Sequence, residues 1–217
     1  ATTVWDVRRR RSAAFFADAA GRWDDIRTEL FGRSASFAPL LGLLNPDSVV
    51  GDLGAGTGAF SEMLAPFVCH VVGIDRSAEM LEAAKLRLED VDNVDLRQGD
   101  LEQLPIEDCE LDVAVLALVL HYIVDPALVF AEVHRALKPG GQVIVVDMRA
   151  HERGPGYAEE MGHVWPGFEL DQVEHWLADA GFEATRTVPL RPDPAASGPL
   201  LFLASAARSS RGPLHRY

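Results

Sequence analysis

A glycine-rich segment directly after an apolar run constrains this chain more than any other feature. Residues 49–60 read VVGDLGAGTGAF, in which Gly54, Gly56 and Gly58 follow a predicted buried strand. Glycines at this spacing let the backbone turn sharply from a strand into a helix and approach a ligand without a Cβ in the way. The segment therefore predicts a nucleotide-type cofactor loop between a strand and a helix.

A second predicted strand, CHVVGID over residues 69–75, ends in Asp75, about 20 residues beyond the glycine loop. A carboxylate at that place accepts hydrogen bonds from the hydroxyl groups of a ribose. The loop and the acid fit NAD as well as S-adenosylmethionine, because Gly54, Gly56 and Ala59 also satisfy the dinucleotide pattern G-x-G-x-x-G/A. These two features alone do not decide which of the two cofactors the chain binds.

Three further motifs follow in order along the chain. They are QGDLEQLP at residues 98–105, LDVAVLALVLHY at 111–122 and RALKPGGQVIVVD at 135–147. Together with GDLGAGTG and GIDRS, this series resembles the successive motifs of the class I S-adenosylmethionine-dependent methyltransferases, over roughly residues 45–150. Five motifs in one order at compatible spacings favour that family over the NAD enzymes.

The resemblance implies a set of residues around S-adenosylmethionine. These are Asp52, Gly54, Gly56, Gly58, Asp75, Arg76, Met80, Gly99, Asp100, Leu101 and Leu116. Asp52 and the glycine loop would hold the methionine end, and Asp75 the ribose. Asp100 would accept a hydrogen bond from the adenine amino group. Leu116 would lie where the fourth strand passes the sulfonium, and would offer its carbonyl oxygen there. Met80 fits ordinary core packing equally well.

Methyl transfer itself needs little side-chain chemistry, because the sulfonium gives its methyl group in line to a nucleophile and orientation supplies much of the acceleration. A base is needed only when the acceptor must lose a proton. His121, directly after the fourth predicted strand, is the candidate base; its other interpretation is a residue that closes the strand. Tyr122, His163 and Trp165 are the candidate contacts to the acceptor, and Trp165 fits core packing equally well.

Three classes of function follow from these features. The first is an enzyme that transfers a methyl group from S-adenosylmethionine to a small-molecule acceptor, with S-adenosylhomocysteine as its product. The second is a module that binds the cofactor as a regulator or sensor without turnover. The third, an NAD-dependent oxidoreductase, has only the glycine loop and Asp75 in its favour.

The flanking segments at residues 11–32 and 157–182 resemble the methyltransferase part of bacterial proteins that carry an ArsR-type DNA-binding domain. That resemblance implies a fused or separate regulatory partner. It also raises arsenic methylation, which the sequence disfavours: a thiolate site for trivalent arsenic needs about three cysteines, and this chain has only Cys69 and Cys109.

Composition narrows the possible partners. The formal charge is −13, from 33 acidic and 20 basic residues, which repels polyphosphate and predicts that no nucleic acid binds. The longest apolar stretch, around residues 113–120, is shorter than the 18 residues or so of a membrane span. No signal-like segment and no metal-ligand spacing are evident, so we expect a cytoplasmic protein without a metal. The oligomeric state is not predicted.

Strands that alternate with helices predict an α/β fold with a doubly wound, Rossmann-like sheet of seven strands. The sheet is expected to be mostly parallel, with a C-terminal antiparallel hairpin and helices on both faces. One domain is expected over 1–206, with a helical N-terminal cap (1–45), a cofactor-binding core (46–150), and a substrate-side insertion, helix and hairpin (151–206). Residues 207–217 are expected to form a flexible tail.

Residues that cap helices or interrupt them predict where individual helices begin and end. Ser77 is expected to cap a helix over residues 78–90. Pro126 is expected to open another helix, which ends at a Lys-Pro-Gly-Gly turn over residues 138–141. A fifth strand would then run over residues 142–147.

Overall fold

The computed structural model describes residues 38–153, 162–193 and 196–210, with a few separate residues among the first 37. The chain forms two compact units, Ala1–Leu44 and Asn45–Tyr217. The first unit includes α3 (Ala38–Leu41). Most of the predicted helical cap lies outside the described residues, as do residues 154–161, 194–195 and 211–217.

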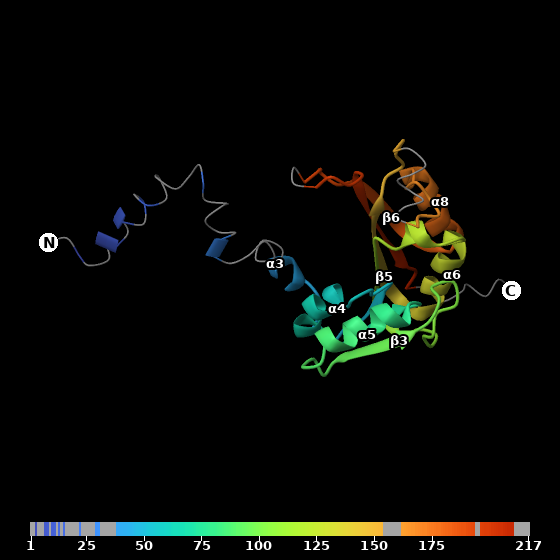
Figure 1. Cartoon of the computed structure of the whole chain (residues 1–217), viewed down its shortest axis with the longest axis horizontal. Coiled ribbons are helices and arrows are strands. Elements are labelled where there is room, and N and C mark those ends of the chain that lie inside the picture. The colour runs from blue at the N-terminus through green and yellow to red at the C-terminus, as the bar shows by residue number, and fades with distance from the viewer. Residues whose placement is uncertain are drawn as a thin grey trace. The chain divides into compact units, whose positions relative to one another are not determined.

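A seven-stranded sheet forms the centre of the second unit (Figure 1). Its strands are β1 (Val49–Leu53), β2 (His70–Asp75), β3 (Val94–Gln98), β4 (Leu111–Ala117), β5 (Leu137–Met148), β6 (Phe182–Pro189) and β7 (Leu201–Arg208). The order across the sheet is β3-β2-β1-β4-β5-β7-β6, with β1 to β5 parallel. Strand β7 runs antiparallel to both β5 and β6, which confirms the predicted sheet and its terminal hairpin.

The connections between the parallel strands are helical. They are α4 (Ala59–Leu64), followed by the 3-10 turn η2 (Ala65–Phe67), then α5 (Ala78–Arg87), η3 (Leu120–Tyr122) and α6 (Pro126–Ala136); α8 (Leu170–Asp179) precedes the hairpin. Ser77 caps α5 as predicted, because its side chain accepts from the Met80 N–H. None of the helices in the described residues is long and apolar enough to span a membrane.

Helices cover both faces of the sheet, as predicted (Figure 1). Helices α4 and α5 pack on one face, where the Ser61 hydroxyl of α4 reaches Asp52 of β1. Helices α6 and α8 pack on the other face, where the rings of Phe130 and Trp176 lie 6.4 Å apart between centroids. The core on that side is rich in aromatic side chains, with Phe130, Phe168 and Phe202 at most 1% exposed. This second layer supports η3 and the carboxyl ends of β4 and β5.

Two boundaries differ from those predicted. Residues 138–141, predicted as a turn, lie within β5 as a bulge, because β4 pairs with the strand on both sides of them: Leu111 opposes Leu137, and Val113 opposes Gln142. Gly140 lies within this bulge and has a positive φ of 82°, a conformation that glycine adopts readily. Strand β7 continues through Arg208, so the first two residues of the predicted tail belong to the sheet.

We predict that Phe130→Ala lowers the free energy of unfolding by about 3–5 kcal/mol, because it empties a fully buried aromatic site between α6 and the sheet. Leu128→Ala, on the same helix but 51% exposed, is the matched control and should cost less than about 0.5 kcal/mol. Urea denaturation followed by circular dichroism measures both. Equal losses would show that α6 does not pack as described.

Candidate functional site

A cavity of about 310 Å³ lies at the carboxyl ends of strands β1 to β4. It is lined by Gly54, Gly56, Asp75, Arg76, Ser77, Met80, Gly99, Asp100, Leu101, Glu102, Leu118, Val119, Tyr122 and Ile123. This edge is where doubly wound sheets bind their ligands. Most of the predicted cofactor residues line the cavity; Asp52, Gly58 and Leu116 do not.

The Asp75 carboxylate connects three elements around the cavity. Its Oδ2 atom accepts from the Gly56 N–H at 2.9 Å, and its Oδ1 atom accepts from the Ser77 N–H at 2.9 Å. The end of β2 is thereby joined to the glycine loop and to the start of α5. Asp75 is half-buried and lines the cavity, so its oxygens are held in place before any ligand binds.

The first two glycines of the loop meet different surroundings. Gly54 has a φ of 85°, and a Cβ there would lie 2.4 Å from Cγ2 of Val119. Gly56 has a φ of 53°, and nothing lies within 4 Å of the position that its Cβ would occupy. Gly54 is therefore required by packing as well as by conformation, whereas Gly56 leaves backbone open to the cavity.

Gly58 and Asp52 lie behind the loop. A Cβ on Gly58 would meet Leu88, just beyond α5, at 3.0 Å, so this glycine serves the packing of α4 against α5. The carboxylate of Asp52 is 2% exposed and accepts from the Ser61 hydroxyl at 2.6 Å. Burial raises the pKa of Asp52, and the hydrogen bonds from Ser61 oppose that shift. In this arrangement Asp52 fixes the strand to α4.

The segment after β3, which carries Asp100 and Leu101, is fastened to α6. The Leu104 N–H donates to the Glu132 carboxylate at 2.9 Å, and Arg135 donates to the carbonyl oxygen of Ile106 at 2.8 Å. The hydrogen bond from Arg135 lowers the pKa of Glu132, so that this acceptor stays ionised. The cavity wall formed by this segment is thus held by charged side chains outside the cavity.

Carboxylates outnumber cations in the lining. Asp75, Asp100 and Glu102 contribute acids, and Arg76 is the single base among the lining residues. Arg76 and Asp100 are exposed, while Leu101 is 5% exposed and Met80 46%. A cavity with this balance favours a ligand with positive charge over one with several phosphates.

His121 lies on η3, and its ring is paired with an acid of β5. Its Nδ1 atom is 2.7 Å from Oδ1 of Asp147, and both residues are buried, at 3% and 0% exposure. The same carboxylate accepts from the N–H groups of Leu120 and Met148. In the tautomer with its proton on Nδ1, the ring donates to Asp147 and keeps its lone pair on Nε2.

Residues 163–165 lie against η3. The N–H groups of Val164 and Trp165 donate to the His121 carbonyl oxygen at 2.9 and 3.1 Å. The His163 ring lies 4.6 Å from the ring of His121 and 5.3 Å from that of Tyr122, measured between centroids. Burial and the neighbouring histidines lower the pKa of His163. His163 does not line the cavity itself, but its ring contacts that of Tyr122, which does.

The side chains of Trp165 and Leu116 pack inside the protein and do not line the cavity. The Trp165 indole N–H donates to the Ile123 carbonyl oxygen at 2.8 Å, and its ring packs beside Phe168 and Trp176. Leu116 is 0% exposed within the sheet. Where β4 ends, Leu118 and Val119 line the cavity in its place.

Sequence reasoning missed several lining residues, namely Ser77, Glu102, Leu118, Val119 and Ile123. Glu102 follows Asp100 and Leu101 closely and could have been included with them. Leu118 gave no such signal: it has a φ of 56°, donates its N–H to the Val146 carbonyl oxygen and stays 48% exposed. Strain of this kind in a non-glycine residue is visible only in the folded chain.

The comparisons with known proteins agree with this geometry. Residues 51–145 match the family model described as a methyltransferase domain. The arsenite methyltransferase of Halobacterium salinarum is 30% identical over 154 residues, which cover 66% of this chain and 39% of that protein. The demethylmenaquinone methyltransferase of Renibacterium salmoninarum is 28% identical over 209 residues, covering 82% of this chain and 86% of that one.

A solved structure shares the fold at lower identity. Phosphoethanolamine N-methyltransferase 2 of Haemonchus contortus, in complex with phosphomonomethylethanolamine and S-adenosylhomocysteine, superposes with a TM-score of 0.70 at 18% identity. The match covers 82% of this chain and 53% of that one. The chain spans less than two thirds of the length of the first curated relatives that it matches. The chain therefore shares the fold of solved methyltransferases, and its residues 51–145 are similar to a methyltransferase domain.

We predict different losses of stability for two alanine substitutions in the loop. Both Gly54→Ala and Gly56→Ala place a side chain at positive φ, which costs about 1–2 kcal/mol. Gly54→Ala adds a clash with Val119 and should cost clearly more, whereas Gly56→Ala serves as the matched control. Urea denaturation without ligand measures both, and equal losses would contradict the packing described for Gly54.

Proposed function

We propose that this chain transfers the methyl group of S-adenosylmethionine to a small-molecule acceptor. The observation that carries the proposal is the cavity itself. Three carboxylates and one arginine line it at the end of a glycine loop, in a sheet of methyltransferase order. S-adenosylmethionine carries a ribose, an adenine, an amino-acid end and a cationic sulfonium, and an acidic cavity suits that cation.

Each part of the cofactor has a proposed partner in the lining. Asp75 would accept from the ribose hydroxyls, because its oxygens already face the cavity and are held by Gly56 and Ser77. Asp100 would accept from the adenine amino group while the Leu101 N–H serves a ring nitrogen. The open backbone at Gly56 would receive the methionine end.

The remaining predicted residues support these contacts. Arg76 and Met80 line the cavity from the start of α5 and would flank the adenine. Gly99 gives the chain room beside Pro105, since a Cβ there would lie 2.6 Å from the proline ring. Asp52 would act through the position of β1, because its carboxylate is buried against Ser61.

The oxidoreductase alternative fits the same cavity poorly. NAD has two phosphates and would bring negative charge against Asp75, Asp100 and Glu102. Dinucleotide-binding sheets have two parallel halves in the order 3-2-1-4-5-6. Here the antiparallel β7 lies between β5 and β6. We therefore favour S-adenosylmethionine.

The acceptor is proposed to be a small molecule, in keeping with relatives named for arsenite and demethylmenaquinone. Arsenite itself is disfavoured by the position of the thiols. Cys69 directly precedes β2 and Cys109 shortly precedes β4, so both lie at the amino edge of the sheet, opposite the cavity. Among the described residues, no group of three or more potential ligands is arranged to hold a metal.

Several expectations from the sequence stay predictions. They are the relationship to ArsR-type fusions, a regulatory partner, a sensor role without turnover, a cytoplasmic location and the lack of nucleic-acid binding. A sensor would bind the cofactor but transfer nothing. Assays of turnover therefore separate it from the enzyme that we propose.

We predict that S-adenosylhomocysteine at about 100 times its Kd stabilises the fold by about 2.7 kcal/mol, while NAD gives no shift. Asp75→Asn should weaken binding about ten- to hundredfold, because it removes charge-assisted hydrogen bonds to the ribose. Asp90→Asn, at an exposed position after α5, is the matched control. Calorimetry and thermal unfolding measure these effects. A larger response to NAD would overturn the cofactor assignment.

His121 is the proposed base for an acceptor that must lose a proton. The contact with Asp147 orients the ring, and in the tautomer that donates from Nδ1 the Nε2 atom would accept the proton. The ring is only 3% exposed, so Tyr122 or His163 must turn aside before an acceptor can reach it. Against this stands the alternative that the protein catalyses by positioning alone, in which case His121 and Asp147 only hold η3 against β5.

We predict that His121→Ala lowers kcat by about 10²–10⁴ with an acceptor that must be deprotonated, and abolishes the fall in rate toward acid pH. Affinity for S-adenosylhomocysteine should be nearly unchanged. His175→Ala, on the exposed surface of α8, is the control. Rate profiles against pH with an acceptor found by screening measure the effect. A loss below about tenfold with the acid limb intact would remove His121 from the chemistry.

A further inference from the structure

The charged and the apolar residues of the cavity lining come from different elements. The charged ones lie at or after the ends of β2 and β3, and they are Asp75, Arg76, Asp100 and Glu102. Among the described lining residues, the end of β4 and η3 contribute no charged side chain. We call this part of the lining the β4–η3 wall; it consists of Leu118, Val119, Tyr122 and Ile123.

The β4–η3 wall is the part of the lining left for the acceptor. In the proposed function, the nucleoside is assigned to the residues after β2 and β3, and the methionine end to the glycine loop. Val119 lies against that loop, because a Cβ on Gly54 would be only 2.4 Å from its Cγ2 atom. The wall therefore borders the end of the cofactor that carries the sulfonium, where an acceptor must approach.

Leu118 is the exposed member of this wall. Its φ is 56°, and its N–H is fixed to the Val146 carbonyl oxygen at 2.8 Å. That backbone conformation is unfavourable for a leucine. The side chain lines the cavity and remains 48% exposed, so packing within the described residues does not bury it. Strain of this kind is concentrated at ligand-binding sites, which favours a ligand as the partner of Leu118.

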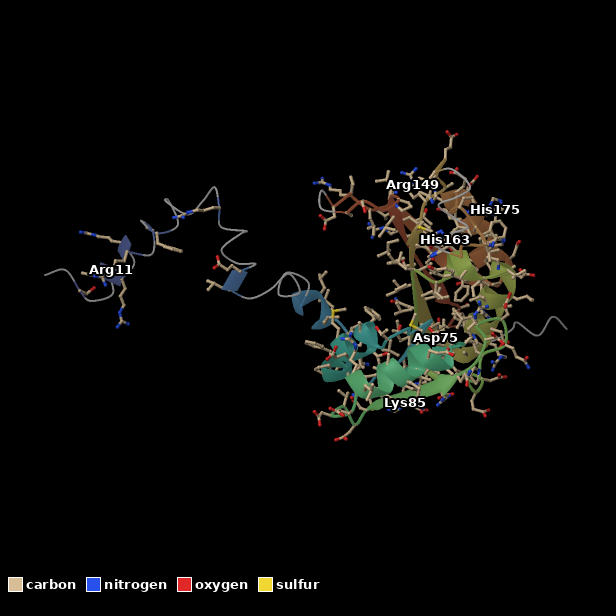
Figure 2. The ribbon with its side chains drawn as sticks, in the orientation of Figure 1. Arg11, Asp75, Lys85, Arg149, His163 and His175 are labelled. Carbon is tan, nitrogen blue, oxygen red and sulfur yellow. The ribbon has the colours of Figure 1, made fainter. Side chains whose placement is uncertain are left out.

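Exposed apolar residues continue on either side of η3. Val124 directly follows Ile123 and is 72% exposed. Val164 is 50% exposed, and its N–H donates to the His121 carbonyl oxygen on η3 at 2.9 Å. Figure 2 shows Asp75 toward α5 and His163, next to Val164 in the chain, toward α8. The surroundings of η3 are therefore apolar, in contrast to the charged residues after β2 and β3.

The polar groups behind the wall do not offer a charge to the cavity. Asp147 is 0% exposed, and its carboxylate contacts the Leu120 and Met148 N–H groups and the His121 ring. Burial lowers the pKa of His163, so its ring next to Tyr122 is uncharged at neutral pH. An ionic group placed against this wall would lose its hydration without gaining an opposite charge there.

We propose that the methyl acceptor is a neutral small molecule with an apolar skeleton, and that Leu118 contacts this skeleton and determines specificity for it. This inference rests on the proposed function and names the class of its substrate. Burial of apolar surface against Leu118 would favour binding, and the Tyr122 hydroxyl would supply a hydrogen bond. The nucleophile of such an acceptor is uncharged as it binds, a hydroxyl for example, in keeping with His121 as the proposed base.

The test uses the whole chain, and binding of S-adenosylhomocysteine is measured first by calorimetry. Methyl signals of Val119 in the complex are then followed by nuclear magnetic resonance during titration with three phenols that share one ring. They are neutral para-ethylphenol, anionic para-hydroxyphenylacetate and cationic tyramine. We expect a saturable shift with para-ethylphenol and an affinity at least about tenfold higher than for either charged phenol, because neither charge finds a partner at the wall.

Variants then test the leucine itself. Leu118→Asn keeps a side chain of similar length and tolerates the positive φ, and it should weaken para-ethylphenol binding about tenfold. Leu118→Gly removes the side chain and relieves the strain, and it should have a similar effect. Both variants should keep their affinity for S-adenosylhomocysteine. Leu128→Asn, at a 51% exposed position on α6 outside the lining, is the matched control and should change neither affinity.

Three results would overturn the proposal. One is a charged phenol that binds as tightly as para-ethylphenol, and another is the absence of a saturable shift with para-ethylphenol; neither depends on a variant that folds. The third is an affinity for para-ethylphenol that both Leu118 variants leave unchanged, or a loss that S-adenosylhomocysteine shares equally, since Leu118 would then serve the cofactor. Failure of S-adenosylhomocysteine to bind at the first step would instead overturn the proposed function.

Discussion

The hydrogen bonds that Asp75 accepts from the Gly56 and Ser77 N–H groups are the interaction on which the site depends. They join the end of β2 to the glycine loop on one side and to the start of α5 on the other. A loop with three positive-φ glycines has little conformational preference of its own. The carboxylate supplies the missing constraint, and it does so with oxygens that still face the cavity.

A second buried carboxylate organises the other half of the site. Asp147 fixes η3 through the Leu120 N–H and the His121 ring, and the His121 carbonyl oxygen in turn accepts from Val164 and Trp165. One acid on β5 therefore positions both the end of β4 and the segment that carries His163. The two carboxylates sit at the ends of parallel strands, where a doubly wound sheet brings its ligand-binding residues together.

Much of the fold was predictable because local signals agreed with one another. Apolar runs, the Ser77 cap and Pro126 at the first turn of α6 marked strands and helices near their observed positions. The Lys-Pro-Gly-Gly sequence misled, because its local preference for a turn was overridden by pairing of β4 on both sides of it. Leu118 was missed for the opposite reason, since nothing local announces a strained leucine.

The sequence by itself determined the order of strands and helices, the glycine loop and the acids that follow β2 and β3, because these depend on residue type and spacing along the chain. Only the tertiary structure decided which of those residues line the cavity. It placed Asp52 against Ser61, Leu116 inside the sheet and Trp165 in the aromatic core. It also brought His121 to Asp147, since residues on different elements meet only through strand register and side-chain alternation.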